Sequence, residues 1–409
     1  MKGHPIEWRG KKVAILGWGI DNQDVEPWLR QQGAEITILD EKKDGKPFGD
    51  LTGYDVLVRS PGVYRYRPEF EGLSVMSKTK IFFDICPGSI IGVTGTKGKG
   101  TTTTLIYEML KAAGKRVFIG GNIGQGVFEY LPRLDENSWV VLELSSFQLT
   151  DLHKSPHIAV VLMTTSEHQD WHRSVAEYIE AKSSITRFQS KKDWTIANKD
   201  YPNTVKIAEQ GKGQKVWVSG KDWVGEMRLR GEHNRENMAA AAAAAKTLDI
   251  RDEIIEKVAR EFKGLEHRLE EVATIGGVTY YDDSFSTVPE TTIAAIKAFT
   301  EPLVVIAGGS EKGSDFTELG KVVSEAINVK AVVLVGLMAE RIGEVIKNKE
   351  IKILRGTKNM TEIMEQVQSV ARSGDVVILS PAAASFDMFK NYKDRGDQFK
   401  AAVKSLASL

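Results

Sequence analysis

The fold is decided by the stretch Ile90-Ile91-Gly92-Val93-Thr94-Gly95-Thr96-Lys97-Gly98-Lys99-Gly100-Thr101-Thr102. It begins as the apolar run of a buried strand and leads into a helical pattern over residues 105–110. Glycines at such a turn allow backbone N–H groups to surround phosphate oxygens, and the following helix presents its positive N-terminal end to them. The stretch therefore predicts an α/β domain with a phosphate-binding loop and a nucleoside triphosphate as its ligand.

The loop departs from the usual spacing at the position that holds a metal ion. Lys99 supplies a point charge for the β- and γ-phosphates, and a Ser or Thr directly after this lysine usually binds Mg²⁺. Here Gly100 follows Lys99 and Thr101 comes next, so the sequence leaves open which hydroxyl would bind the metal. The residues predicted to contact the nucleotide are Gly95, Thr96, Lys97, Gly98, Lys99, Gly100, Thr101 and Thr102.

Composition and charge exclude several classes of protein. The chain has 409 residues, and at roughly 150 residues per domain this predicts two or three domains. Lys and Arg total 55, as do Asp and Glu, so no overall basic field would hold nucleic acid or an anionic membrane. Cys86 is the single cysteine, the N-terminus lacks a signal-peptide pattern, and the apolar runs are far shorter than the ~20 residues of a membrane span. We therefore expect a cytoplasmic monomer with no nucleic-acid partner and no membrane span.

The order of patterns along the chain predicts an α/β fold class with three domains. A β-rich run, a glycine turn and a helical pattern follow one another three times, as in parallel α/β units. We predict a Rossmann-like N-terminal domain over residues 1–89, a central P-loop ATPase-type domain over residues 90–265 and a Rossmann-like C-terminal domain over residues 266–409. Beyond the run before the loop, the strands predicted are 12–16, 35–39, 55–58, 139–144, 158–163, 278–281, 303–307, 331–335 and 376–379. Seven consecutive alanines within residues 238–246 predict a closely packed helix without chemistry.

Acidic and histidine side chains follow two predicted strands of the central domain. Glu143 ends one strand, and His168, Asp170 and His172 follow the next. Because ligands collect at the carboxyl ends of parallel strands, Glu143 and His168 are candidate metal or nucleotide ligands there. For Asp170 and His172 a surface role is equally open.

The first strand turns at Gly17-Trp18-Gly19, and Asp40 ends the second strand about 20 residues later. This spacing is typical of a dinucleotide site, but Asn22 stands where the third glycine belongs. A nucleotide-linked substrate is therefore favoured over the nicotinamide of an oxidoreductase, and a tight turn without a ligand stays open.

Taken in order, several motifs resemble those of the Mur ligase family, the ATP-dependent amide-bond enzymes of peptidoglycan precursor synthesis. They are the loop Thr94 to Thr102, Gly120-Gly121-Asn122-Ile123-Gly124, Glu143-Leu144-Ser145-Ser146-Phe147-Gln148, Glu167-His168, Ala181-Lys182, Gly231-Glu232-His233-Asn234, His267-Arg268-Leu269-Glu270 and Asp282-Asp283-Ser284. Within the family, the sequence is most similar to the ligases that add glutamate to UDP-N-acetylmuramoyl-L-alanine. This likeness rests on Ser60-Pro61-Gly62, Gly308-Gly309-Ser310-Glu311-Lys312, the segment from Ser380 to Tyr392, and Arg395-Gly396.

The resemblance implies roles for the nucleotide and metal residues. ATP would lie on the loop with Lys99 on its phosphates, Asn234 and Arg268 as further contacts, and Asp283 on the ribose. Mg²⁺ would be held by Thr101, Glu143, His168 and Lys182, the last as a carbamate formed with CO₂. Without the resemblance, Lys182 would be taken for an exposed helix lysine.

The resemblance also implies both substrate sites and the reaction. Gly17, Trp18, Asp40 and Gly62 would face the UDP part of UDP-N-acetylmuramoyl-L-alanine, with Asn122 along the substrate's path. Thr287, Lys312, Ser385 and Tyr392 would hold the glutamate. The muramoyl-alanine carboxylate would attack the γ-phosphate of ATP, and the amine of glutamate would attack the resulting acyl phosphate.

Some positions depart from the family pattern. Phe285 and Val288 stand where ligases for D-glutamate usually carry lysine and asparagine, so addition of L-glutamate or another amino acid is the alternative. Lys97 occupies a position that is usually asparagine, and the inserted Gly100 is a feature shared with folylpolyglutamate synthases. Those enzymes lack a domain like residues 1–89 and a segment like 380–390, so this sister family is not favoured. An alternative of another class is a nucleotide-binding protein without turnover. The presence of Lys99, Glu143, His168 and Lys182 favours the enzyme.

Overall fold

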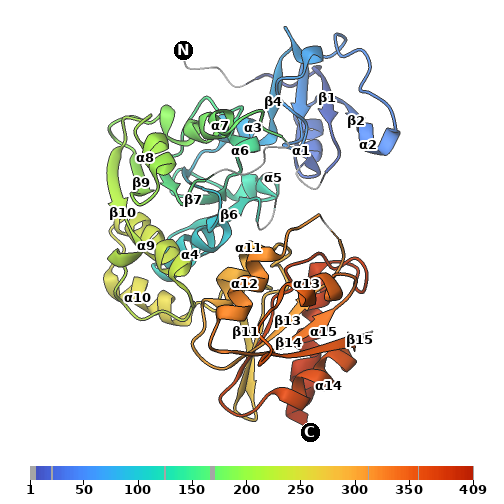
Figure 1. Ribbon diagram of the computed structural model, residues 1–409. Coiled ribbons are helices and arrows are strands. Elements are labelled where there is room, and N and C mark those ends of the chain that lie inside the picture. Colours follow the sequence, from blue (N-terminus) through green and yellow to red (C-terminus); the bar gives the residue numbers. More distant parts are fainter. Residues whose placement is uncertain are drawn as a thin grey trace. The chain divides into compact units, whose positions relative to one another are not determined.

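The computed structural model describes residues 6–19, 22–123, 126–165, 171–311, 313–357 and 359–408. The chain divides into two compact units. The first unit comprises Met1–Glu226 and His233–Arg260, and the second comprises Met227–Glu232 and Glu261–Leu409. The described strands form three sheets, two in the first unit and one in the second (Figure 1). The predicted α/β class is confirmed, and the predicted domain ranges stay a prediction.

The first sheet is parallel and has the strand order β2-β1-β3-β4. Its strands are β1 (Lys12–Leu16), β2 (Glu35–Leu39), β3 (Val56–Arg59) and β4 (Val75–Ser77), and its helices are α1 (Val25–Gln31), α2 (Glu41–Asp44) and α3 (Lys78–Ile85). Four successive residues of β1, from Val13 to Leu16, are fully buried, as expected where both faces of a parallel sheet are covered.

The second sheet is parallel with the order β10-β9-β8-β5-β7-β6. Its strands are β5 (Ser89–Thr94), β6 (Val117–Gly121), β7 (Trp139–Glu143), β8 (Ile158–Val161), β9 (Trp194–Asn198) and β10 (Gln214–Val218). The helices after β5 are α4 (Lys99–Ala112), α5 (Val127–Tyr130), α6 (Ser146–Leu149), α7 (Val175–Arg187), α8 (Pro202–Ala208), α9 (Glu232–Lys246) and α10 (Asp252–Glu261). Because β7 and β8 lie on opposite sides of β5, the ligand crevice of such a sheet is expected beside β5.

The third sheet has the order β11-β12-β16-β13-β14-β15, in which β11 is antiparallel to β12 and the other pairs are parallel. Its strands are β11 (Glu270–Ile275), β12 (Val278–Asp282), β13 (Leu303–Gly308), β14 (Val329–Val335), β15 (Lys352–Thr357) and β16 (Val376–Leu379). Its helices are α11 (Pro289–Ile296), α12 (Thr317–Glu325), α13 (Ala339–Val345), α14 (Met360–Val370) and α15 (Tyr392–Ser405).

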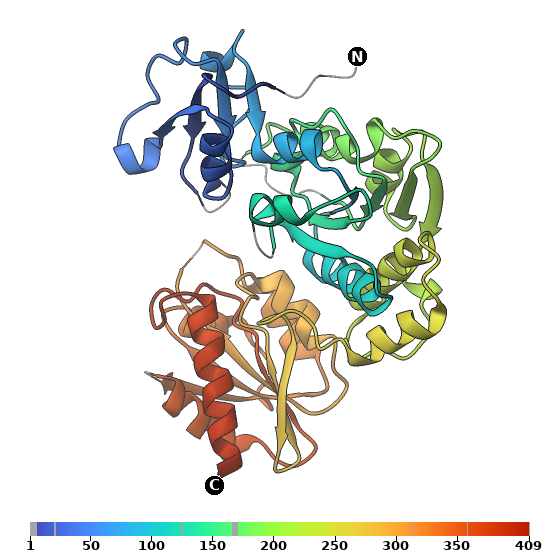
Figure 2. The same ribbon diagram turned by 180° about the vertical axis from the view of Figure 1, so that it is seen from behind.

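The third sheet has two apolar cores, one on each face, because successive side chains of its strands point to opposite faces. Val305 packs with Ile296 of α11 and Leu319 of α12, whereas Val304 packs with Val367 of α14 and with α15. Figure 2 shows α15 in front of the sheet, on the side turned away in Figure 1. Successive residues of a strand point to opposite faces, so a run of apolar residues such as β13 must be covered on both.

The strand predictions agree closely with the structure. β1, β2 and β16 have the predicted bounds, and the other predicted strands differ by one or two residues at an end. The alanine run lies in α9, where six of the seven alanines are fully or nearly buried: Ala239, Ala240, Ala241, Ala242, Ala244 and Ala245. The prediction of a closely packed helix is therefore confirmed.

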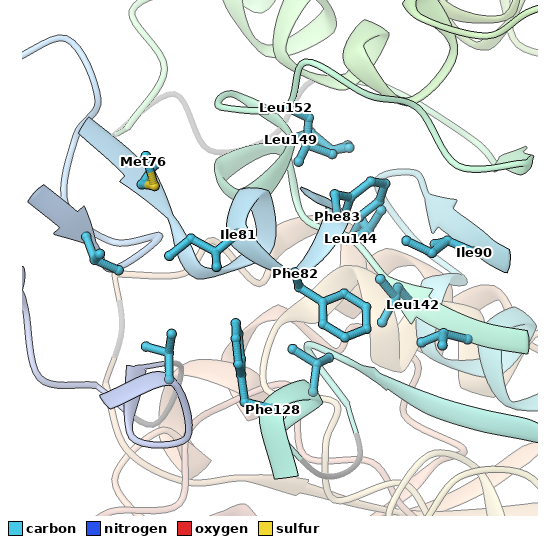
Figure 3. Close-up of a cluster of buried hydrophobic side chains, with 14 of the residues drawn as sticks. Met76, Ile81, Phe82, Phe83, Ile90, Phe128, Leu142, Leu144, Leu149 and Leu152 are labelled. Carbon is cyan, nitrogen blue, oxygen red and sulfur yellow. The ribbon is translucent and has the colours of Figure 1, made fainter. Parts of the chain in front are cut away.

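Helix α3 connects the first two sheets and contributes to one core shared by both. Phe82 on α3 meets Phe128 on α5 edge to face, with ring centroids 6.2 Å apart. Figure 3 shows these rings together with Leu142 of β7 and Ile90 of β5. The first unit therefore has a continuous apolar core between its two sheets.

A buried ion pair also joins these sheets. The guanidinium of Arg59, at the end of β3, lies 2.7 Å from the carboxylate of Asp151, and both side chains are nearly inaccessible. Arg65 makes a second ion pair with Asp151 at 3.0 Å, and Arg59 donates hydrogen bonds to the carbonyl oxygens of Val63 and Phe147. Burial lowers the pKa of Arg59, and the charge of Asp151 opposes this shift.

We predict that Asp151→Ala destabilises the protein by about 3–5 kcal/mol, because it leaves a buried guanidinium without its counter-charge. Urea unfolding followed by tryptophan fluorescence measures the loss. Asp84→Ala is the matched control, since Asp84 pairs with Lys80 and Lys154 at the surface and its loss should cost less than about 1 kcal/mol. Equal effects of the two substitutions would contradict the prediction.

Candidate functional site

The predicted phosphate-binding loop lies between β5 and α4, at the carboxyl end of the sheet. Gly98 ends the loop with φ +84°, and a Cβ there would lie 2.1 Å from Oδ1 of Asn237. Lys99 begins α4, and its Nζ donates to the carbonyl oxygens of Gly95 and Thr96 at 3.1 and 3.0 Å. The loop therefore requires glycine at position 98, and it holds the Lys99 ammonium against its own backbone.

Helix α7 brings Lys182 to the same loop. The Lys182 side chain is 1% exposed, so its interpretation as an exposed helix lysine is wrong. Its Nζ donates to Oγ1 of Thr94 at 3.1 Å and to the carbonyl oxygen of Gly95 at 3.0 Å. The Gly95 carbonyl thus accepts hydrogen bonds from both Lys99 and Lys182.

Two residues that the sequence analysis did not name support this arrangement. Tyr178, one turn before Lys182 on α7, is buried, and its hydroxyl lies 3.0 Å from Oγ1 of Thr96. Asn237 packs against Gly98 and donates to Oδ1 of Asn234, a predicted nucleotide contact, at 3.1 Å. The spacings i, i+4 and i, i+3 on one helix are the sequence signal that would have suggested both residues.

The predicted metal ligands that the structure describes include oxygen atoms around the loop. Glu143 ends β7, next to β5, and is 6% exposed. Thr103 and Thr104 donate to the carbonyl oxygens of Lys99 and Gly100, whereas Oγ1 of Thr102 is buried without a hydrogen-bond partner among the described residues. A carboxylate and a threonine hydroxyl suit Mg²⁺, so these residues fit the metal, with Thr101 and Thr102 both still candidates.

The remaining candidate residues of the central domain follow strands of the second sheet. His168, with Asp170, lies outside the described residues. His172 is buried, and its Nε2 lies 2.8 Å from Oγ of Ser146 while its ring stacks on Phe147. Asn122 directly follows β6, and its backbone N–H donates to the carbonyl oxygen of Glu143 at 3.1 Å.

The candidate UDP residues gather at the carboxyl ends of β1, β2 and β3. Gly17 has φ +81°, and a Cβ there would lie 3.0 Å from Cβ of Ser60. The backbone N–H of Trp18 donates to Asp40 at 2.6 Å, and this bond is the main reason that the pKa of Asp40 is lowered. Gly62 follows β3, and no atom would lie within 4 Å of a Cβ there. The structure thus brings Gly17, Trp18 and Asp40 together beside open space at Gly62.

The candidate residues of the second unit surround the carboxyl ends of β12 and β16. Asp283 accepts hydrogen bonds from Leu269, Ser286 and Ser380, and burial raises its pKa to about 7. Ser385 is buried after β16, Tyr392 begins α15, and Thr287 follows the Asp283 turn. Lys312 lies outside the described residues.

Comparison with known proteins identifies the class. Two family models match the chain, the Mur ligase middle domain over residues 93–223 and the Mur ligase glutamate ligase domain over residues 267–383. The UDP-N-acetylmuramoylalanine–D-glutamate ligase of Acetivibrio thermocellus is 38% identical over 97% of this chain and 97% of that protein. The chain therefore belongs to the Mur ligase family of ATP-dependent amide-bond ligases. This membership decides against the oxidoreductase alternative.

Other relatives agree. The ligase of the same name from Symbiobacterium thermophilum is 35% identical over 97% of this chain and 98% of that protein. The crystal structure of the UDP-N-acetylmuramate-alanine ligase of Thermotoga maritima has a TM-score of 0.61 at 17% identity, covering 97% of this chain and 99% of that one. The MurF ligase of Thermotoga maritima in complex with ADP has a TM-score of 0.61 at 18% identity, covering 98% and 96%. At these identities the two structures show the shared fold.

No helix in the described ranges is both long enough and apolar enough to cross a bilayer. This agrees with the short apolar runs of the sequence.

The segment around Arg268 is fixed by a buried pair next to it. Nδ1 of His267 lies 2.7 Å from Oδ2 of Asp282, and this hydrogen bond raises the pKa of His267 against the opposing effect of burial. A Cβ at Gly396 would lie 2.2 Å from Nδ1 of His267, so α15 packs directly on the pair. The pair therefore ties the chain before β11 to β12 and α15.

We predict that this pair stabilises the second unit less as pH rises. The imidazole pKa is about 6.5 in the unfolded chain and higher in the folded one, so the contribution is complete below about pH 6.5 and is lost as pH rises through the folded pKa. Urea midpoints measured between about pH 6 and pH 9 test this prediction. His267→Asn should flatten this part of the profile, and parallel profiles of the two proteins would contradict it.

Proposed function

We propose that this Mur ligase adds D-glutamate to UDP-N-acetylmuramoyl-L-alanine, with ATP converted to ADP and phosphate. The proposal is supported by the relatives of that name, which match over nearly the whole chain. Such a reaction supplies a peptidoglycan precursor. We also propose that it takes place in the cytoplasm, where ATP and nucleotide-linked precursors are found, and that the three predicted domains act within a monomer.

The observation that carries the proposal is the meeting of two lysines on one carbonyl. Lys99 and Lys182 both donate to the carbonyl oxygen of Gly95, and Glu143 ends the adjacent strand. The cation of Lys99 at a glycine loop favours a polyanion such as a triphosphate, and Lys182, as a carbamate, would be an anionic metal ligand beside it. Mg²⁺, bound by Glu143 and a hydroxyl of Thr101 or Thr102, together with His168 and Lys182, would offset the charge that develops on the transferred phosphoryl group.

The reaction has two steps. A carboxylate oxygen of the muramoyl-alanine attacks the γ-phosphorus in line, the bond to the β-phosphate oxygen breaks, and ADP leaves. Lys99 stabilises the negative charge on the phosphoryl oxygens. The amine of glutamate then attacks the acyl carbon, loses a proton, and expels phosphate to leave the amide.

The family resemblance implies the binding roles. Gly17, Trp18, Asp40 and Gly62 would hold the UDP part, with Asn122 beside the acceptor chain. Asn234, Arg268 and Asp283 would contact the nucleotide. Thr287, Lys312, Ser385 and Tyr392 would hold the glutamate, and bringing the two substrates together in register supplies much of the acceleration.

A phosphate-release assay with UDP-N-acetylmuramoyl-L-alanine and ATP tests the proposal. We expect release with D-glutamate and little with L-glutamate or other amino acids. Lys99→Ala should lower turnover by at least about a hundredfold while leaving the melting temperature nearly unchanged, because it removes charge stabilisation and little packing. Preference for L-glutamate would move the assignment to the variant ligase, and no release with any amino acid would favour a binding protein without turnover.

We predict that Lys182→Ala loses activity and that acetate at high concentration partly restores it. The carbamate would place a carboxylate-like group beside the loop, and a small carboxylate can occupy the space that the shortened side chain leaves. Phosphate release measured with increasing acetate tests this prediction. Lys99→Ala is the control, since acetate cannot replace a cation, and equal or absent rescue of both variants would speak against the carbamate.

A further inference from the structure

The turn after β12 presents one aromatic ring from an otherwise buried segment. Asp282, Asp283, Ser284 and Ser286 are all buried, whereas Phe285 between them is 38% exposed. Its place on a rigid turn among predicted site residues makes this partly exposed ring a candidate for a contact function.

The backbone of this turn is fixed from both sides. The N–H of Phe285 donates to the carbonyl oxygen of His267 at 2.9 Å, and the N–H of Ala382 donates to the carbonyl oxygen of Ser286 at 2.9 Å. Nε of the buried Arg395 donates to Oγ of Ser284 at 2.9 Å. The ring of Phe285 is therefore held on a backbone that has little freedom to move.

The guanidinium of Arg268 lies on this ring. Its central carbon is 3.8 Å from the ring centroid of Phe285, well inside the range of cation–π attraction. His267 and Leu269, on either side of Arg268, have φ values of +62° and +49°, which are uncommon for residues with a side chain. Such backbone strain persists only where the surroundings enforce it, and it concentrates at functional sites.

Tyr392, a predicted glutamate contact, meets the same ring. The centroids of Phe285 and Tyr392 are 5.1 Å apart with an interplanar angle of 89°, and Oγ of Ser284 donates to the carbonyl oxygen of Tyr392 at 2.7 Å. The cation of Arg268 and the ring of Tyr392 are thus both arranged around Phe285.

We propose that Phe285 is a positioning residue that holds the Arg268 guanidinium for an oxyanion of a substrate. The inference deepens the proposed ligase function and rests on it. A guanidinium keeps its charge and donates several N–H groups in a fixed fork, which suits either a nucleotide phosphate or the carboxylate of glutamate. The cation of Arg268 would also supply the positive charge that the sequence lacks at position 285.

The test compares Phe285→Leu with Phe285→Tyr. Phe285→Leu, which loses the aromatic face, should raise the KM for one substrate by about three- to tenfold with a smaller change in kcat. Phe285→Tyr keeps the face, so its KM and kcat values should stay near those of the unsubstituted protein. A rise in the KM for ATP identifies the phosphate as the anion, and a rise in the KM for D-glutamate identifies the carboxylate. Ile327→Ala, at a fully exposed position of the same unit, is the control and should change neither KM.

A double-mutant cycle separates positioning from a general structural effect. In an Arg268→Ala background, Phe285→Leu should have little further effect on either KM, because the ring acts through the guanidinium. The melting temperature of Phe285→Leu should fall only slightly, because leucine keeps an apolar side chain at this partly exposed position. Independent effects of the two substitutions, unchanged KM values for Phe285→Leu, or an equal loss in Phe285→Tyr would each overturn the inference.

The inference can be tested even if the proposed ligase activity is not found. If the unsubstituted protein released no phosphate, calorimetric titration of the full chain with ADP and with D-glutamate would replace the kinetic comparison. Weaker binding of either ligand by Phe285→Leu, restored in Phe285→Tyr, would support the inference, and equal binding by all three proteins would overturn it.

Discussion

The carbonyl oxygen of Gly95 accepts hydrogen bonds from two lysine side chains, and the arrangement of the central site depends on this convergence. Two ammonium groups on one carbonyl repel each other, and Lys182 is almost inaccessible to water. A polyanionic ligand, or carbamylation of Lys182 itself, would relieve this repulsion. A site that brings cations together in this way suits the binding of phosphates. The position of the Gly95 carbonyl, on which the two lysines meet, therefore bears on the chemistry of the enzyme.

The fold could be predicted from the sequence where the signal is local. Apolar runs located β1 and β16 to the residue, because a strand buried on both faces must be apolar throughout. The predicted bounds of β2 are also correct, although this edge strand is largely exposed. β11 was missed. Its sequence Glu270-Glu271-Val272-Ala273-Thr274-Ile275 is only half-buried and pairs antiparallel at the edge of its sheet, with a register shift between Glu271 and Ala273. An edge strand of this kind has neither a continuous apolar run nor a clear alternation.

The site could be predicted only in part, for the same reason. The loop from Gly95 to Thr102 is a contiguous motif, so its position at the end of β5 follows from local sequence. The contact between Lys182 and Gly95 joins residues 87 positions apart, and no local pattern reveals that Lys182 is buried. Tyr178 and Asn237 were missed although each lies one helical turn from a predicted site residue, because their contacts with the loop, at Thr96 and Gly98, join distant parts of the sequence. The family resemblance added information on residues far apart in the sequence, because it rests on the order of distant motifs. The periodicity of apolar residues does not reveal that order.

In the second unit, the cation of Arg395 has a structural role. Arg395 is 1% exposed, and its guanidinium donates to Ser284 and to the carbonyl oxygens of Ala383 and Ala384. Burial lowers its pKa to about 10, so it stays charged at neutral pH while its hydrogen bonds fasten two turns together. A guanidinium committed to the backbone in this way cannot also turn toward a ligand. A positive charge for a substrate would then come from other residues, such as Arg268 or the predicted glutamate contact Lys312, and the proposed role of the ring beneath Arg268 is to hold the first of these.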